Sequence, residues 1–224
     1  MKIAAPRLRA HLDPASPDRD DIDDETRLLD VSLDDVDLSD LEVEHLELSG
    51  CRLTRCKLAG SDLDKLILVD TELTQCDIAN ARWADAAVTR VAITSSRLTG
   101  FAGPGMSLQH TTIRDSVLDF GSFRFAKFLK VEFADCRLQN ADFVSADLSG
   151  TVFRGCDFTG AEFSQVKAAG AVFVECTWDT ARGLTSLTGA TVAASSPIDT
   201  LTFAGAVTTA AGITLVHPDE LDGA

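Results

Sequence analysis

The sequence predicts an all-β fold, a right-handed quadrilateral β-helix in which the chain turns a corner every five residues. Three observations predict it. Apolar side chains recur at every fifth position from Leu28 to Trp178, and Gly103 is the only one of these 31 positions without one. No insertion or deletion breaks the phase. A second register, two residues earlier, holds small side chains such as Ala141 and Cys156.

A period of five fits neither an α-helix, which repeats every 3.6 residues, nor a simple strand, which repeats every two. It fits a square coil in which each side points one large and one small side chain inward. Four sides make one coil, so residues 20 apart should stack on one another. The 31 pentapeptides make about 7.75 coils, which form a rod ~37 Å long at the ~4.8 Å spacing of neighbouring strands.

The predicted β-helix spans residues 26–180 and leaves a segment at each end. Residues 1–25 carry three prolines and no repeat, so we expect an N-terminal cap or a partly ordered arm. Residues 181–224 should form a C-terminal cap. Ser196 followed by Pro197 predicts the start of a helix over about 197–211, which Gly212 ends. A short strand over 213–216 should follow.

Segments such as ADFVS-ADLSG at 141–150 and CDFTG-AEFSQ at 156–165 carry a motif of the form A-(D/N)-L-x-x. The repeat resembles that of the pentapeptide repeat proteins, here of an actinobacterial type, over roughly 70% of the chain. More distantly, the chain is similar to the mycobacterial and Qnr-type quinolone-resistance members. The resemblance implies the β-helical fold, and a C-terminal helix that joins two copies into a homodimer.

The predicted C-terminal helix is apolar on more than one side, so it needs more than one surface to pack against. One surface is the last coil, and the second could be another copy of the chain. A monomeric cap is the alternative. The candidate dimer-interface residues are Ile198, Leu201, Phe203, Ala204 and Val207.

All six cysteines occupy the small inward register, and five of them share one column. A ladder of parallel side chains does not converge on one point, as metal ligands must. We therefore expect buried thiols, with no metal, disulfide or cofactor. His45 and His110 fall on different faces, so no Cys–His or Ser–His pair is visible, and we expect no enzyme.

One coil is irregular, at Phe101, Gly103, Pro104 and Gly105. Here a large residue takes the small register and glycine takes the large one, so Phe101 should fill the space that Gly103 leaves. Pro104 and Gly105 suit a turn or a bulge. The irregularity is either local compensation without a function, or a kink or contact point in the middle of the rod.

The net charge of −15 argues against direct binding of nucleic acid or an anionic membrane. No segment has the length of a signal peptide or a membrane helix, so a cytoplasmic location is expected. The acids gather near the N-terminus: residues 20–48 hold thirteen acids and one base, whereas residues 49–180 hold sixteen and fourteen. The candidate partner surface is Asp34, Asp35, Asp37, Asp40, Glu42, Glu44 and Glu47.

These features favour a non-catalytic protein-interaction scaffold whose acidic N-terminal end meets a basic partner of unknown identity. The alternative is a DNA mimic that modulates DNA gyrase or another topoisomerase, as in the quinolone-resistance members. A duplex ~37 Å long bears roughly 22 charges. The long, nearly neutral part of the rod is a poor match for that density, so only the first one or two coils qualify.

Overall fold

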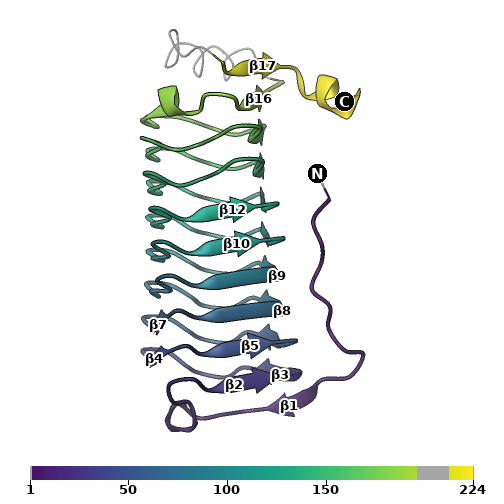
Figure 1. Cartoon of the computed structure of the whole chain (residues 1–224), viewed down its shortest axis with the longest axis vertical. Helices are drawn as coiled ribbons and strands as arrows, with labels where there is room; N and C mark the ends of the chain where they lie inside the picture. Colours follow the sequence, from purple (N-terminus) through teal and green to yellow (C-terminus); the bar gives the residue numbers. More distant parts are fainter. Residues whose placement is uncertain (1, 196–211, 224) are drawn as a thin grey trace.

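The computed structural model describes residues 2–195 and 212–223, and it shows a rod of stacked coils with the N-terminal end at its base (Figure 1). The predicted fold class is confirmed, because the strands form one parallel solenoid. The 15-stranded sheet runs along the rod in the order β1-β3-β6-β8-β9-β11-β13-β14-β15-β16-β17. Two further strands, β4 and β7, pair on another side of the rod.

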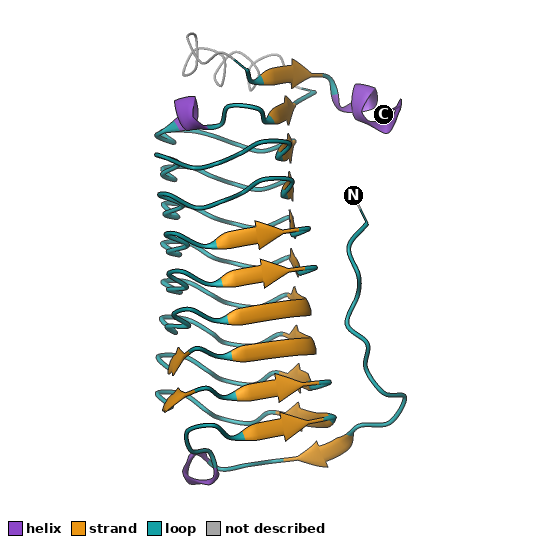
Figure 2. Ribbon diagram, viewed as in Figure 1, coloured by secondary structure: helices purple, strands orange, loops and turns teal. Residues whose placement is uncertain are grey.

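The strands are short because each ends where the chain turns a corner (Figure 2). They are β1 (Asp13–Ala15), β2 (Arg27–Leu29), β3 (Val31–Asp34), β4 (Glu42–Glu44), β5 (Glu47–Ser49), β6 (Arg52–Thr54), β7 (Asp62–Asp64), β8 (Ile67–Thr74), β9 (Ala87–Thr94), β10 (Ser107–Gln109), β11 (Thr112–Arg114), β12 (Lys127–Leu129), β13 (Glu132–Ala134), β14 (Val152–Arg154), β15 (Val172–Val174), β16 (Thr191–Ala193) and β17 (Thr214–Val216). The helices in the described residues are short 3-10 helices: η1 (Arg19–Asp21), η2 (Leu184–Ser186) and η3 (Pro218–Gly223).

The ladder keeps a strict step of 20 residues through the repeat, as the pairs Leu53 with Leu73 and Phe133 with Phe153 show. The step changes only at the ends. Residue 13 pairs with residue 31, a step of 18, and residue 172 pairs with residue 191, a step of 19. Four pentapeptides therefore make each coil, as predicted, and departures in coil length are confined to the two caps.

Every fifth residue sits at a corner with positive φ, which explains the Asp, Asn and Gly that recur there. Asp40 (φ 54°) and Asn80 (φ 55°) tolerate the left-handed conformation, and Gly60 (φ 70°) adopts it without strain. At Gly60 a side chain is also excluded by space, since a Cβ would lie 2.3 Å from Asp40 Oδ1 of the preceding coil. Apart from Phe120 and Phe125, the described corners therefore turn at polar or small residues while the sides hold the core.

The large inward residues form stacked columns, which become aromatic in the second half of the rod. The ring centroids of Phe133 and Phe153 lie 5.0 Å apart with an interplanar angle of 15°, and those of Phe153 and Phe173 lie 4.9 Å apart at 5°. All three rings are fully buried. The phenylalanine columns are thus core packing at the coil spacing, not an exposed aromatic stripe.

All six cysteines are buried and free, as the small inward register predicts. Their thiols lie against backbone carbonyls of the coils, as Cys136 Sγ does 3.4 Å from the oxygen of Ile113. Burial raises the pKa of the Cys51 thiol. Among the described residues no cluster of His, Cys, Asp or Glu has an arrangement suited to a metal ion.

Residues 13–25 close the base of the rod. β1 adds to the sheet, and Ile22 is buried against the core. Residues 2–10 then run back along the outside of the rod as an extended arm (Figure 1). The arm is held at corners of alternate coils: Arg9 Nη2 lies 3.0 Å from Asp30 Oδ2, and the Arg7 amide donates to Asp70 Oδ1 at 3.0 Å. The amide of Ala4 donates to Nδ1 of His110, two coils beyond Asp70.

At the other end the stack continues past the repeat through β16 and β17. β17 lies at the position of the short strand expected from the sequence, and Leu215 pairs with Val192. The helix expected over 197–211 lies outside the described residues, and so do all five residues of the candidate dimer interface, from Ile198 to Val207. No helix of the described residues is long and apolar enough to cross a membrane.

Candidate interaction surface

The acidic residues predicted to form one surface are spread around the first full coil. Asp34 and Asp35 lie at one corner, Asp37 lies on the next side of the square, and Asp40 lies at the corner that ends this side. Glu42 and Glu44 belong to β4, and Glu47 belongs to β5. The structure therefore does not bring all seven together. Asp37, Asp40 and Glu42 converge, and the other four face elsewhere.

Bases of the following coil neutralise part of this acidic band. Arg55 bridges Asp34 and Asp35, with its Nε and Nη2 atoms both 2.9 Å from the Asp35 carboxylate. The hydrogen bond from Arg55 lowers the pKa of Asp35. Lys65 Nζ lies 3.5 Å from Glu44 Oε2. These carboxylates are satisfied within the chain, so they present less charge to a partner than the sequence suggests.

Among the seven candidate acids, Asp37 is the one whose ionised form is most strongly stabilised by its neighbours. The Ser39 amide donates to Asp37 Oδ1 at 3.1 Å, and Lys57 Nζ lies 3.1 Å from Oδ2. The hydrogen bonds from Ser39, followed by that from Lys57, lower the pKa of Asp37 to about 2. Asp37 is therefore ionised throughout the neutral range. It also lines a hollow of the described surface.

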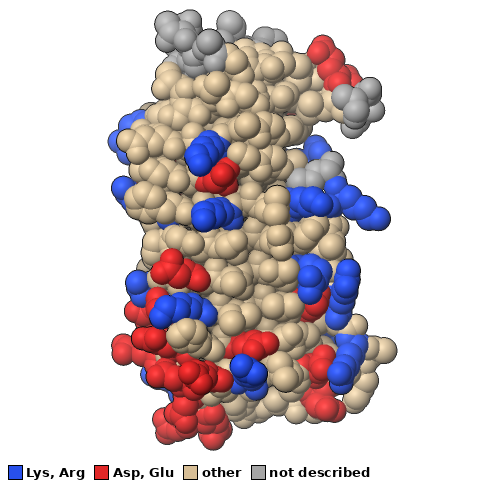
Figure 3. Space-filling model, in the orientation of Figure 1, with Lys and Arg blue, Asp and Glu red and all other residues tan. Residues whose placement is uncertain are grey.

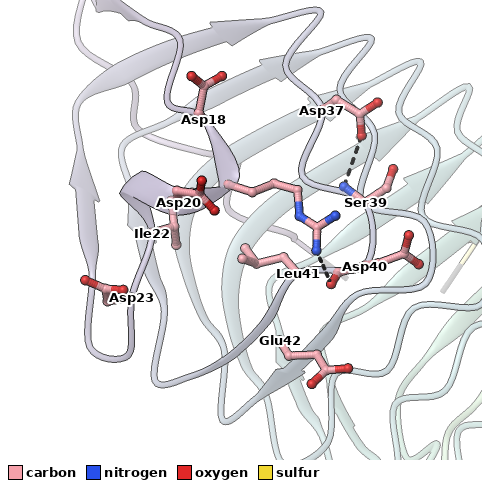
Figure 4. A pocket seen from close by; sticks show the side chains of 10 residues that line it. Asp18, Asp20, Ile22, Asp23, Asp37, Ser39, Asp40, Leu41 and Glu42 are labelled. Carbon is pink, nitrogen blue, oxygen red and sulfur yellow. Dashed lines mark hydrogen bonds between the residues drawn. The ribbon is translucent and has the colours of Figure 1, made fainter.

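This hollow lies at the N-terminal end of the rod, between η1 and the first coil, and has a volume of about 1150 Å³ (Figure 4). Six carboxylates and one guanidinium line it. Its residues, which we call the acidic hollow, are Asp18, Arg19, Asp20, Ile22, Asp23, Asp37, Ser39, Asp40, Leu41 and Glu42. In the space-filling view the acidic side chains gather at this end, whereas bases and acids are interspersed higher on the rod (Figure 3).

Arg19 reaches from η1 across the acidic hollow. Its Nη2 donates to the backbone oxygen of Asp40 at 2.8 Å, and six carboxylates line the same hollow. In the described part of the chain, Arg19 has no carboxylate within ion-pair distance, and Asp20 and Glu42 have no basic side chain within ion-pair distance. The hollow therefore already holds one guanidinium and retains several unpaired negative charges.

Sequence reasoning missed Asp18, Asp20 and Asp23 as members of a site with Asp40 and Glu42. They precede the repeat, so its period does not place them. A signal was available in the local sequence: Asp18 followed by Asp21 is a capping pattern for a helical turn, and Asp18 N donates to Asp21 Oδ2 at 2.9 Å. That turn folds the acids of residues 18–23 toward the first coil.

The irregular coil keeps its register. Ala102 pairs with residues one coil away on both sides, so Phe101 and Gly103 cause neither a bulge nor an insertion. The ring of Phe101 is buried and fills the space beside Gly103, where a Cβ would lie 2.9 Å from Phe101 Cε1 and 2.3 Å from Met106 Sδ. Pro104 and Gly105 form the corner turn, with φ of 71° at Gly105.

Comparison with known proteins identifies the repeat. The family model described as pentapeptide repeats (8 copies) matches at residues 47–82, 122–155 and 136–173. No curated protein sequence matches significantly. Among solved structures, QnrB1, a plasmid-mediated fluoroquinolone resistance protein, is 16% identical, covering 94% of each chain at a TM-score of 0.41.

HetL, a pentapeptide repeat protein involved in regulating heterocyst differentiation in the cyanobacterium Nostoc, is 12% identical. The match covers 75% of this chain and 87% of HetL at a TM-score of 0.25. The period of five, the 20-residue register of the ladder and the matched repeats agree with one another. The repeated part of the chain, at residues 47–82 and 122–173, matches the pentapeptide repeat family.

Proposed function

We propose that the protein is a non-catalytic interaction scaffold whose acidic hollow binds a basic segment of a partner protein. The supporting observation is a contrast in ion pairing. Most acids along the stack face a base one coil away, as Asp77 faces Arg97 and Asp62 faces Arg82. In the acidic hollow, five of the six carboxylates have no such base within ion-pair distance in the described residues, Asp37 being the exception.

Arg19 indicates which chemistry the hollow accepts. A guanidinium is planar, always charged and only weakly hydrated, so it suits a site lined by carboxylates and carbonyl oxygens. Arg19 uses one N–H group for the Asp40 carbonyl. An arginine or lysine side chain of a partner would find the remaining carboxylates of Asp20, Asp23 and Glu42 without a competing cation.

The energetics favour such a partner. Like charges held close together repel one another, and this repulsion destabilises the folded end of the rod. A bound cationic segment removes the repulsion and stabilises the folded state by mass action. The interaction should weaken with salt, since exposed charges are screened beyond ~10 Å at 0.1 M ionic strength.

An octa-arginine peptide with a fluorescent label tests the proposal by anisotropy. The hollow variant is Asp20→Asn, Asp40→Asn and Glu42→Gln. The control variant changes three exposed acids elsewhere, Asp85→Asn, Asp115→Asn and Asp179→Asn, so both variants change the net charge equally. We expect the hollow variant to lose at least tenfold in affinity and the control to bind nearly as wild type does. Equal losses in the two variants would contradict the proposal.

DNA gyrase is the second candidate partner, because a DNA-binding groove is a basic surface of the kind that the acidic hollow fits. Here the first coil would act as a short mimic of the duplex, and the acidic charge at one end of the rod favours this reading (Figure 3). The test is gyrase supercoiling with wild type, the hollow variant and the control variant. The proposal is supported if wild type and the control variant inhibit supercoiling and the hollow variant does not. Supercoiling that is unchanged by micromolar wild type would exclude gyrase as the partner.

A further inference from the structure

Two phenylalanines occupy corners of the rod where the backbone disfavours them. Phe120 has φ of 56° and is 64% exposed, and Phe125 has φ of 60° and is 59% exposed. The other non-glycine residues with positive φ in the described chain are polar or charged. A bulky residue in the left-handed region is an outlier. Neither ring contributes to the core, so the fold itself does not require them.

The two rings border one side of the square. In the coils of Ala102 and Ser122, the one charged residue between the corners of that side is Arg124, which pairs with Asp142 of the next coil. The side carries β4 and β7 near its base, on the edge opposite the N-terminal arm (Figure 1). One ladder of outward residues follows it: Asp62, Arg82, Ala102, Ser122, Asp142, Glu162 and Arg182. Pro104 and Gly105 of the irregular coil lie on the same side, directly before Phe120 and Phe125.

We propose that this side, which we call the Phe120–Phe125 face, is where a second copy of the chain docks in antiparallel orientation. The order of charges along the ladder carries the argument. The proposed two-fold axis passes through the coil of Ser122, lies in the plane of contact and runs perpendicular to the rod. It places each ladder residue opposite the residue of the second copy that lies equally far from Ser122 in the other direction. One coil from Ser122, the small Ala102 faces Asp142 of the second copy. That carboxylate is already neutralised within its own chain, because Arg124 Nη1 lies 2.7 Å from Asp142 Oδ2.

Further from the axis the opposed charges are complementary. Arg82 comes to face Glu162 of the second copy, and Asp62 comes to face Arg182. Each pair is already joined within its own chain, Arg82 Nη1 to Asp62 Oδ1 at 2.8 Å and Arg182 Nε to Glu162 Oε2 at 3.1 Å. At each end of the contact, docking therefore places the Arg82–Asp62 pair of one copy beside the Glu162–Arg182 pair of the other, so that each charge faces an opposite charge.

The axis brings each exposed ring near its own symmetry mate, because lateral position on the face is preserved. Phe120 meets Phe120 of the second copy along one edge, and Phe125 meets Phe125 along the other. Arg124 also comes to lie opposite its own mate, and each of these guanidinium groups is neutralised by Asp142 of its own chain. Such rings bury a large apolar area at small conformational cost. Antiparallel pairing also keeps the two acidic N-terminal ends apart, whereas parallel pairing would place them together.

The size of the face sets the expected strength. Six ladder steps of ~4.8 Å give a contact ~29 Å long. One side of five residues is at most ~16 Å wide. The two copies together would bury no more than about 900 Å², which belongs to the range of weak, reversible complexes. The dimer should therefore form at high micromolar concentration and dissociate on dilution.

Sedimentation equilibrium of the full chain tests the proposal. We expect wild type to dimerise reversibly, and Phe120→Asn with Phe125→Asn to weaken the dimer at least tenfold. Asn tolerates the left-handed conformation, so the variant should have a Tm equal to or above that of wild type, which excludes unfolding as the cause. A wild type that stays monomeric at high micromolar concentration, or a dimer that the substitutions leave unchanged, would overturn the proposal.

Crosslinking with a short bis-maleimide tests the orientation, since the native cysteines are buried. Ser122→Cys lies on the axis and should crosslink to its own mate. Ser164→Cys, on the same face, should not, because its mate lies ~19 Å away along the rod at four ladder steps. Ser107→Cys, on a different side, is the background control. Self-crosslinking of Ser164→Cys as efficient as that of Ser122→Cys would indicate parallel pairing and contradict the arrangement.

Discussion

Arg90 and Asp70 form a two-pronged ion pair between corresponding corners of successive coils. Arg90 Nε lies 2.6 Å from Asp70 Oδ1, and Nη2 lies 2.6 Å from Oδ2. Both side chains are largely covered, and Asp70 also accepts the Arg7 amide of the N-terminal arm at 3.0 Å. One carboxylate therefore joins two coils and the arm. The hydrogen bond from Arg90 is the main cause that lowers the pKa of Asp70.

Replacing Asp70→Asn should make the free energy of unfolding depend less on pH. Because the folded-state pKa of Asp70 is depressed, its contribution is fully present above the unfolded value of 3.8. It is lost as the pH falls through the folded value. We expect a difference of roughly 1–3 kcal/mol between wild type and variant at neutral pH. Urea unfolding at a series of pH values measures it.

The control for that series is Asp115→Asn, which removes an exposed corner carboxylate with no ion pair in the described chain. It should change the free energy of unfolding by less than ~0.5 kcal/mol. A deficit for Asp70→Asn that is as large at pH 2 as at pH 7 would show that the ionised pair is not its source.

Gly103→Leu should destabilise the rod, because a side chain there collides with Phe101 and Met106. Overpacking of this kind costs about 1–3 kcal/mol. Phe101→Ala alone leaves a cavity and costs about 3–5 kcal/mol. The double substitution restores the small–large order of the other coils, so its cost should be smaller than the sum of the two. Denaturant unfolding of the three variants checks this. If the cost of the double substitution equals the sum of the two single costs, Phe101 does not fill the space that Gly103 leaves.

The buried thiols should react slowly in the folded protein. Burial raises the pKa of Cys51, so little of the reactive thiolate is present near neutral pH. A thiol reagent should modify all six cysteines quickly after denaturation and none of them quickly before. Rapid native reaction of one or more thiols, or a disulfide in the purified protein, would contradict the packing of the small register.

The period of five predicted the stack, the core residues and the burial of the cysteines, because each depends only on position within the repeat. The ion pairs were less visible but could have been found. Arg55 lies 20 residues after Asp35, and Arg97 lies 20 after Asp77, so comparing charges one coil apart predicts which acids are neutralised.

The acidic hollow and the path of the arm could not be predicted in this way. Asp18, Asp20 and Asp23 lie outside the repeat, and their position depends on the single turn of η1. The arm follows one corner of the rod because Asp30 pairs with Arg9, and because Asp70 and His110 accept hydrogen bonds from backbone amides of the arm. Such contacts depend on individual side chains and not on a period, so only the three-dimensional arrangement shows them.

The measurement that tests the proposed function most directly is hydrogen exchange of the wild-type protein with and without the octa-arginine peptide. Binding in the acidic hollow predicts slower exchange of the amides at 18–23 and 37–42, with the remaining coils unchanged. The hollow variant should show no such protection at the same peptide concentration. Protection spread evenly along the rod, or located away from these two segments, would contradict the assignment of the hollow as the docking site.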